Sequence, residues 1–385
     1  PSYRPWKIVH IDLREPLSTL QIDASEAGAF VVFWADDRPL GHRLVDASTL
    51  PLAPAQLATL AAEVVAPAVG DALFEHGFRG PLPVEGSNPA RDTPPDLDTL
   101  RTLDRPLDRL PTRPRSPSNS TLSVVVCTRD RPGDLRHCLD ALDAVTRPAD
   151  EIIVVDNAPS TPATQRLVAS RPHVRYVREP QPGLSHARNT GLRHATSELV
   201  AFTDDDVVVH PAWTEQLIAA FADSQIDAVT GNVLPAELET EAQFLFQYSH
   251  KSHGWPQRTL TFDDWFLATM RHLGAPVWHI GAGANMAFRR SVFGQVGGFD
   301  VRLGAGASGC SEDSELWYRL LASGHRCRYV PSAVVFHYHR RSLEALEEQL
   351  YQYMRGHVAA LLVQFQHSRD WGGLRRTFLT LPYYY

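Results

Sequence analysis

Three consecutive aspartates at positions 204–206 follow an apolar run, residues 199–203, that predicts a buried strand. Three adjacent carboxylates repel one another, and nothing in a hydrophobic core would compensate their charge. A divalent cation does compensate it, because Mg²⁺ and Mn²⁺ bind one or two carboxylates together with phosphate oxygens. The alternative is an acidic helix start, in which Asp206 caps a helix that begins near His210.

Two earlier predicted strands also end in polar residues. Thr128 and Arg131 follow the strand at residues 122–127, and Asp156 follows the strand at residues 151–155. Because neighbouring parallel strands bind ligands at their carboxyl ends, we expect these side chains to lie beside the aspartates. Asp156 could accept the imide N–H of a uracil ring, with Thr128 and Arg131 lining the pocket. An ordinary turn is the alternative interpretation for each residue taken singly.

Further along the chain come two more groups suited to this chemistry. Arg188 stands near the start of a predicted helix, residues 184–195, where a guanidinium could bind a diphosphate or a ribose; a surface arginine is the alternative. Glu312 and Asp313 follow a glycine-rich stretch, residues 304–309, and precede a helical pattern. A carboxylate there could take the proton of an acceptor hydroxyl, whereas an acidic helix cap is the alternative.

These residues need a sheet to position them, and the chain from residue 121 onward has the corresponding pattern. Apolar strands alternate there with helices, which predicts a mainly parallel α/β sheet with helices on both faces. We expect a small α/β N-terminal domain over residues 1–80 and a proline-rich linker over residues 81–120. The catalytic domain is predicted over residues 121–340, and a C-terminal helical extension over residues 341–385.

The composition narrows the class of protein. The 385 residues carry a formal net charge of −7, with 43% hydrophobic and 21% charged residues, which is ordinary for a soluble protein and argues against a nucleic-acid partner. The sequence opens without a signal-peptide pattern, and its apolar runs are far shorter than the ~20 residues of a membrane span. It therefore predicts a cytoplasmic protein, with peripheral membrane contact through the C-terminal amphipathic pattern as an alternative.

The order of these segments resembles the family 2 glycosyltransferases, which have the GT-A fold. Residues 123–131 resemble the opening strand of that family, residues 153–157 its second strand, and residues 201–206 its DxD-type motif. Residues 311–319 match its acidic catalytic segment, although Ser311 stands where a more usual member has a glycine. The resemblance is specific because several motifs occur in the right order.

The resemblance implies a role for each matching residue. Asp204 would lie near the ribose, Asp206 would bind Mn²⁺ or Mg²⁺, and His337 would be a further metal ligand, with His339 as its rival. Asp313 would be the general base. The predicted nucleotide site comprises Thr128, Arg131, Asp156, Arg188, Asp204 and Asp205; the metal site Asp204, Asp206 and His337; the catalytic pair Glu312 and Asp313; and the sugar and acceptor loop Gly283, Ala284, Asn285 and Trp317.

The predicted function is the transfer of a sugar, with inversion, from a nucleotide-sugar to a hydroxyl group. The resemblance favours a UDP-sugar donor, and the acceptor is a carbohydrate, a lipid-linked or another hydroxyl compound. One alternative is a nucleotidyltransferase that makes nucleotide-sugars, although the loop at residues 128–131 lacks the glycines of that class. The other alternative is a non-catalytic module that binds a sugar or a nucleotide.

Overall fold

The structure is a computed structural model that describes residues 3–75, 119–249 and 257–384. The chain divides into two compact units, which are treated separately below. The N-terminal unit comprises residues 1–114 and 237–258, and the large unit comprises residues 115–236 and 259–385. The linker predicted over residues 81–120 lies outside the described residues, apart from its last two positions.

In its described residues, the N-terminal unit contains a three-stranded sheet and the long helix α1. β1 (Trp6–Asp12) pairs in parallel with β2 (Gly28–Ala35), and β2 pairs antiparallel with β3 (Arg38–Asp46). α1 (Pro54–Glu75) buries its alanine and valine side chains against alternate residues of β2. The helix continues through Pro67 although proline weakens a helix interior, because its apolar face is buried along the whole sheet.

A segment from much later in the chain belongs to this unit. The backbone N–H of Trp6 donates to the carbonyl of Leu238 at 3.0 Å, and the Trp6 ring stacks on Phe244 with 5.1 Å between the ring centroids. Phe244 lies on α7 (Glu241–Ser249). Residues 237–258 therefore group with the N-terminal unit, so the domain expected over residues 121–340 is not continuous along the chain.

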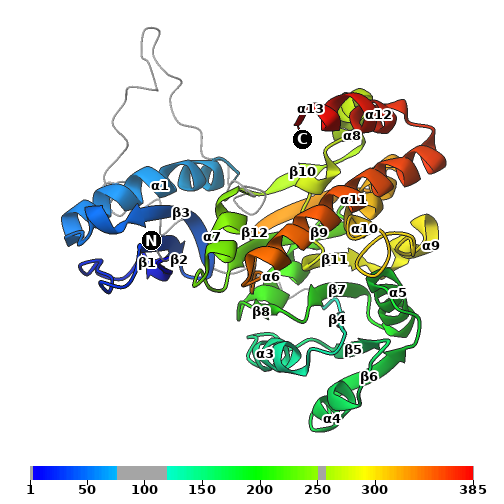
Figure 1. The fold of residues 1–385 in the computed structure, drawn as a ribbon, viewed down its shortest axis with the longest axis horizontal. Helices are drawn as coiled ribbons and strands as arrows, with labels where there is room; N and C mark the ends of the chain where they lie inside the picture. The colour runs from blue at the N-terminus through cyan, green and yellow to red at the C-terminus, as the bar shows by residue number, and fades with distance from the viewer. Residues whose placement is uncertain (1–2, 76–118, 250–256, 385) are drawn as a thin grey trace. The chain divides into compact units, whose positions relative to one another are not determined.

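The large unit is built on a sheet with the strand order β10-β12-β9-β11-β7-β4-β5-β6, and β8 pairs with β12 (Figure 1). β4 to β7 are mutually parallel, β9 and β12 form a second parallel pair, and β11 runs antiparallel between β7 and β9. The mainly parallel α/β sheet predicted from the sequence is therefore confirmed. The strands are β4 (Leu122–Thr128), β5 (Glu151–Asn157), β6 (Val174–Glu179), β7 (Leu199–Asp204), β8 (Val207–Val209), β9 (Ala228–Pro235), β10 (Leu260–Phe262), β11 (Asn285–Arg289) and β12 (Cys327–His337).

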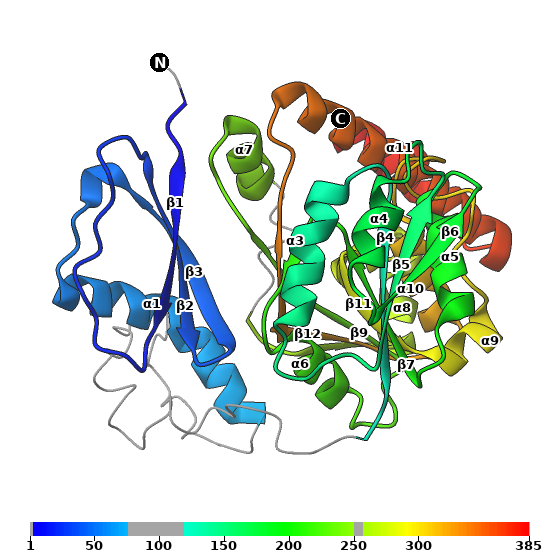
Figure 2. The same ribbon diagram turned by 90° about the horizontal axis from the view of Figure 1, so that it is seen from below.

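Helices cover both faces of this sheet, as Figure 2 shows for α3 and α5 on either side of β4 and β5. Successive residues of a strand point to opposite faces, so Val124 packs among one set of helices and Val125 packs against Gly191 of α5. The first set is α3 (Pro132–Asp143), α4 (Ala163–Ala169) and α6 (Trp213–Ala220); the other face carries α5 (Leu184–His194), α9 (Phe293–Val296) and α10 (Glu312–Ala322).

The C-terminal residues form a helical cover on the large unit. α11 (Leu343–Ser368) lies against the glycine-rich loop, where Arg355 donates to the carbonyl of Ser308 at 2.8 Å. α8 (Asp264–Met270), a short 3-10 turn (Arg271–Leu273), α12 (Trp371–Arg375), a π-helical turn (Arg376–Thr380) and α13 (Leu381–Tyr384) complete the unit. Within the described part of the chain, we find no helix that is both long and apolar enough to cross a bilayer.

Candidate functional site

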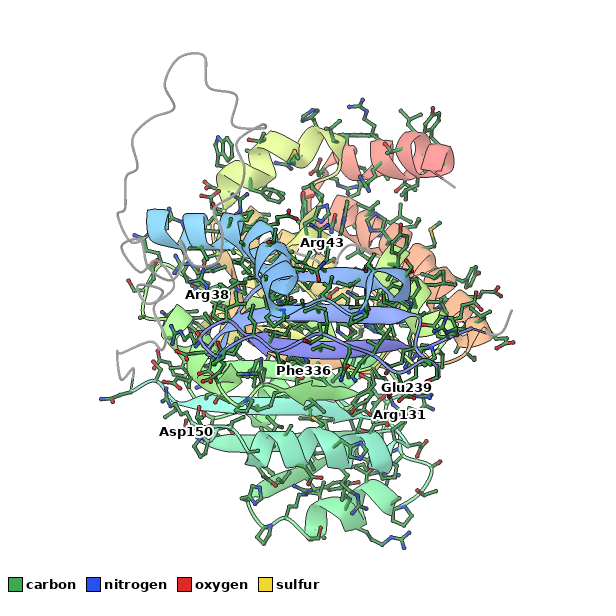
Figure 3. The ribbon with its side chains drawn as sticks, turned by 90° about the vertical axis from the view of Figure 1, so that its left-hand side faces the viewer. Arg38, Arg43, Arg131, Asp150, Glu239 and Phe336 are labelled. Atoms are coloured by element: carbon green, nitrogen blue, oxygen red, sulfur yellow. The ribbon has the colours of Figure 1, made fainter. Side chains whose placement is uncertain are left out.

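The carboxyl ends of the parallel strands meet at one edge of the sheet. Thr128 at the end of β4 pairs with Asp156 at the end of β5, and β7 ends beside them at Asp204. The opposite edge holds Asp150, whose carboxylate accepts a hydrogen bond from the first residue of β4 at 2.8 Å. Figure 3 shows Arg131 and Asp150 at opposite ends of the strands. The polar residues that follow the strands are thus brought together, as a parallel arrangement predicts.

A short strand brings a histidine to the aspartates. β8 starts directly after Asp206 and pairs antiparallel with the end of β12, which places Val207 opposite His337. The His337 Nε2 atom lies 3.4 Å from the Asp206 Oδ1 atom. One ligand atom from each of Asp204, Asp206 and His337 lies within 4.8 Å of the other two, the one such group of His, Cys, Asp or Glu found among the described residues.

The chemistry of this group suits a divalent cation. Two ligands of one Mg²⁺ or Mn²⁺ ion lie at most about 4.2–4.4 Å apart, because each bond is about 2.1–2.2 Å long, so small side-chain movements suffice to share an ion. Burial alone would raise the pKa of Asp206, but His337 and Arg131 outweigh burial and hold that pKa below its ordinary value. The Asp206 carboxylate is therefore ionised at neutral pH and has the charge that binds a cation.

Asp206 does not cap a helix. Its backbone carbonyl accepts a hydrogen bond from Tyr338 N at 3.0 Å, and β8 separates it from α6, whose N-cap is Ala212. The acidic-helix-start interpretation of the aspartate run is therefore wrong, because the chain continues as a strand after Asp206.

The two rival histidines occupy different positions. The Nδ1 atoms of His337 and His339 lie 3.1 Å apart, so one ring donates a hydrogen bond to the other. This contact leaves the Nε2 atom of His337 turned toward Asp206. His339 is buried and stands behind its neighbour, outside the group of three. The structure thus brings His337 to the carboxylates and gives His339 a position from which it orients the His337 ring.

Arg131 bridges two of the aspartates from a partly exposed position. Its guanidinium lies 2.7 Å from the Asp205 Oδ1 atom and 2.8 Å from the Asp206 Oδ2 atom. Asp205 is fully buried and also accepts a hydrogen bond from the Thr128 hydroxyl at 2.7 Å. Burial raises the pKa of Asp205 to about 7, although Arg131 opposes this shift. Asp205 therefore holds Thr128 and Arg131 in place from inside the fold.

Asp156 carries an unsatisfied acceptor atom. Its side chain is fully buried, and Tyr176 donates its hydroxyl to the Oδ2 atom at 2.9 Å. The Thr164 hydroxyl also stabilises the carboxylate, whereas no hydrogen bond of good geometry reaches the Oδ1 atom from the described residues. Burial raises the pKa of this carboxyl. A buried acceptor without a donor is costly, so Asp156 suits a ligand that offers an N–H group. Sequence analysis does not identify Tyr176, because its position beside Asp156 depends on the pairing of β5 with β6.

Arg188 joins three segments inside the site. Its guanidinium forms an ion pair with Glu312 and lies 3.2 Å from both the Asp204 Oδ1 atom and the Gly283 carbonyl oxygen. Only 2% of its side chain is exposed. The surface-arginine alternative is therefore wrong. The structure differs from the predicted contact of Arg188 with the nucleotide, because the charge of Arg188 is paired with the buried Glu312 carboxylate and the half-buried Asp204 carboxylate.

Asp313 and Glu312 begin α10 but point to different partners. The Asp313 Oδ2 atom accepts a hydrogen bond from Gly283 N at 2.8 Å, and this side chain is half-buried. Glu312 is buried against Arg188; burial raises the pKa of Glu312 to about 7, with Arg188 opposing. Ser311 has a φ of +69°, in the left-handed region that favours glycine, the residue that the family resemblance leads one to expect there.

Two residues of the predicted sugar and acceptor loop belong to the core. Trp317 is fully buried and stacks on a phenylalanine of β11, with 5.2 Å between the ring centroids. Asn285 is also fully buried; it accepts a hydrogen bond from Trp213 at 2.8 Å and donates to the backbone of β9 and β12. The structure therefore places both side chains in the core and not at the predicted loop, because their partners lie on other strands of the sheet. Gly283 and Ala284 contribute backbone contacts beside the carboxylates.

The fold and the site together define a mainly parallel α/β domain with an acidic, metal-type site at the carboxyl edge of its strands. Residues 123–297 match the family model for glycosyl transferase family 2. Residues 123–297 are thus similar to a glycosyl transferase family 2 domain, in agreement with the resemblance seen in the motifs.

Several curated proteins are similar to the chain. The pre-mycofactocin glycosyltransferase of Mycobacterium tuberculosis is 29% identical over 235 residues, which cover 60% of this chain and 46% of that protein. The succinoglycan biosynthesis protein ExoM of Rhizobium meliloti is 27% identical over 230 residues, covering 56% of this chain and 67% of that protein. The chain thus spans about half the length of the mycobacterial protein.

Among solved structures, the chain is similar to the mannosyltransferase PcManGT from Pyrobaculum calidifontis in complex with GDP-Man and Mn²⁺. The TM-score is 0.49 at 21% identity, over 70% of this chain and 73% of that one. A second similar structure is glucosyl-3-phosphoglycerate synthase from Mycobacterium tuberculosis with Mn²⁺, UDP and phosphoglyceric acid. It has a TM-score of 0.44 and 19% identity, over 64% of this chain and 78% of that one.

Proposed function

We propose that this chain is an inverting glycosyltransferase that moves a sugar from a nucleotide-sugar to a hydroxyl acceptor. The observation that carries the proposal is the group formed by Asp204, Asp206 and His337 at the carboxyl edge of the sheet. Gly283 links this group to the base candidate, since its carbonyl accepts from Arg188 and its N–H donates to Asp313. A metal-type site and a carboxylate are thus held against one loop.

The metal site suits Mn²⁺ better than Mg²⁺. Asp204 and Asp206 offer oxygen ligands that both ions accept, but His337 offers an imidazole nitrogen, whereas Mg²⁺ is a hard cation that prefers oxygen. A bound cation would neutralise the leaving diphosphate. Arg131 lies beside the same carboxylates with a partly exposed guanidinium, so it can contact the phosphates of the donor.

Asp156 is the proposed reader of the base. Its buried Oδ1 atom needs a donor, and the imide N–H of uracil supplies one, which favours a UDP-sugar. Access to this atom requires that neighbouring side chains move, because Asp156 is fully buried. Guanine also carries a ring N–H, so GDP-sugars are the comparison that tests this step.

Asp313 is the proposed general base, and the structure favours it over Glu312. Glu312 is committed to Arg188 in a buried ion pair, whereas Asp313 is half-buried and oriented by the N–H of Gly283. A carboxylate within hydrogen-bond reach of the acceptor hydroxyl would take its proton as the oxygen attacks C1 from the side opposite the leaving group. A single displacement of this kind inverts the anomeric configuration.

A donor panel tests the proposal. The chain is incubated with UDP-, GDP- and dTDP-sugars and Mn²⁺, and release of the nucleoside diphosphate is measured with and without EDTA. We expect metal-dependent release from a UDP-sugar, and NMR of a transfer product should show inversion relative to the donor. Retention contradicts the mechanism. Formation of a nucleotide-sugar from a nucleoside triphosphate and a sugar phosphate would identify a nucleotidyltransferase, and binding without turnover a non-catalytic module.

The acceptor is proposed only as a class. Asp313 as a base requires only that the acceptor carry a free hydroxyl group. This requirement is met by a carbohydrate, by a lipid-linked compound and by other hydroxyl compounds. The names of the similar proteins refer to two different products, pre-mycofactocin and succinoglycan, so they favour none of these acceptors over the others.

A further inference from the structure

One corner of the large unit exposes large apolar side chains on two segments that are distant in the sequence. The first segment contains α8 and the 3-10 turn after it, and the second contains α12 and the π-helical turn. The exposed fractions are 73% for Trp265, 44% for Leu273, 72% for Trp371, 68% for Phe378 and 69% for Leu379. Such side chains are normally scattered singly on a protein surface, so their concentration on two short segments indicates a binding surface.

Several contacts hold the two segments together. The Arg271 Nε atom lies 3.0 Å from the Asp370 Oδ2 atom, and Arg375 donates to the carbonyl of His272 at 3.3 Å. Gly372 lies so close to the Arg271 carbonyl that a side chain would not fit between the segments. Figure 1 shows α8 and α12 next to each other at this corner. The two groups of apolar side chains therefore belong to one region of the surface, called here the C-terminal aromatic surface.

The charges on this surface are mainly positive. Arg271, Arg369 and Arg375 are exposed. Of the acidic residues on the two segments, Asp370 is buried and paired with Arg271, and Asp263 caps α8, which leaves Asp264 as the exposed carboxylate there. Aromatic and arginine side chains together suit the headgroup region of a bilayer, because their apolar parts contact the lipid chains while their polar ends stay in water.

We propose that the C-terminal aromatic surface binds the headgroup region of an anionic lipid bilayer. Trp265, Trp371 and Phe378 insert into the interface, and the exposed arginines contact lipid phosphates. The positive charge is what favours an anionic bilayer over a second copy of this chain, since two like-charged surfaces repel each other. This inference does not depend on the proposed sugar transfer.

Vesicle sedimentation of the full chain tests the proposal. We expect the chain to sediment with vesicles of phosphatidylcholine and phosphatidylglycerol, to bind pure phosphatidylcholine vesicles much more weakly, and to lose binding as salt rises. The double variant Trp371→Ser, Phe378→Ser should weaken binding by roughly tenfold or more. The double variant Arg369→Gln, Arg375→Gln should also weaken it by roughly tenfold and reduce its salt dependence. All four side chains are exposed, so both variants should fold.

Tyr248→Ser is the matched control, because that side chain is 61% exposed but lies on α7 in the N-terminal unit. The control should bind vesicles like the unmodified chain. Equal sedimentation of the aromatic variant, or no sedimentation with anionic vesicles, overturns the proposal. A dimer in analytical ultracentrifugation that the aromatic variant abolishes would overturn it too, since a second copy would then occupy the surface.

Discussion

Two arginines balance the carboxylates of the site, and their surroundings differ. Arg131 contacts Asp205 and Asp206 with a side chain that is 37% exposed, whereas Arg188 contacts Asp204 and Glu312 with a side chain that is 2% exposed. An exposed guanidinium can exchange a carboxylate for a phosphate at little cost. A buried guanidinium cannot do so, because its departure would leave carboxylates unpaired inside the protein, where a charge without a partner is costly.

The difference separates two roles that look alike in sequence. Arg131 follows a predicted strand and Arg188 follows a predicted turn, and both come before the three aspartates in the sequence. The sequence therefore predicts that both contact the nucleotide. Solvent exposure assigns Arg131 to the ligand-binding side and Arg188 to the support beneath it. The acidic residues divide in the same way. Asp206 pairs with the partly exposed Arg131 and Asp313 is half-buried, so a ligand can reach both, whereas Glu312 is buried in its pair with Arg188.

The largest expected effect concerns the ligand-binding side. Asp206→Ala should abolish metal-dependent nucleotide binding and leave the fold intact, because it removes the carboxylate shared by His337 and Arg131. Calorimetry with UDP and Mn²⁺ measures the affinity, and circular dichroism checks the fold. Asp264→Ala, which removes an exposed carboxylate far along the chain, is the control and should bind normally. An unchanged affinity for Asp206→Ala would exclude the metal assignment.

The buried arginine should matter most for stability. Arg188→Met should lower the free energy of unfolding by about 3–5 kcal/mol, because it leaves the Glu312 and Asp204 carboxylates without their partner. Urea denaturation measures the change. Adding Glu312→Gln to Arg188→Met should recover part of the loss, since it removes one uncompensated charge. If Arg188→Met unfolds at the same urea concentration as the unmodified chain, the supporting role is wrong.

Asp313→Asn should separate catalysis from binding. The amide is nearly isosteric but takes no proton, so kcat should fall by roughly 10²-fold or more while donor and metal affinities stay unchanged. Steady-state kinetics with the active nucleotide-sugar measures kcat, and calorimetry measures the affinities. Normal kcat together with weakened donor binding would make Asp313 a binding residue. Glu312→Gln offers the contrast, because it should chiefly lower stability by breaking the pair with Arg188.

The smallest effect is expected for Arg131→Met, the counterpart of the change at Arg188. The free energy of unfolding should fall by less than for Arg188→Met, because Asp206 keeps His337 as a partner and Asp205, whose pKa burial raises to about 7, can take up a proton when Arg131 is lost. Nucleotide affinity should weaken by about tenfold through loss of a charged hydrogen bond to phosphate. Urea denaturation and calorimetry in parallel give both numbers. A destabilisation as large as that of Arg188→Met would remove the distinction between the two arginines.

Much of the large unit follows from the sequence alone. The apolar runs at residues 122–127, 151–155 and 199–203 predict buried parallel strands, and the structure has β4, β5 and β7 there. Because the carboxyl ends of parallel strands share an edge, the sequence also predicts that Thr128, Asp156 and the aspartate run meet. These features follow from residues that are close in the sequence, because a run of apolar residues predicts a buried parallel strand and the end of that strand predicts the ligand-binding edge.

The tertiary structure decided which side chain of each candidate set faces the site. His337 and His339 are two residues apart on one strand face, and the pairing of β8 with β12 selects His337. Packing also turned Trp317 and Asn285 into core residues and buried Arg188 beneath the carboxylates. Their partners come from segments up to 124 residues away in the sequence, as for Arg188 and Glu312. Burial and charge pairing between such distant segments are properties of the folded chain, so no local pattern can reveal them.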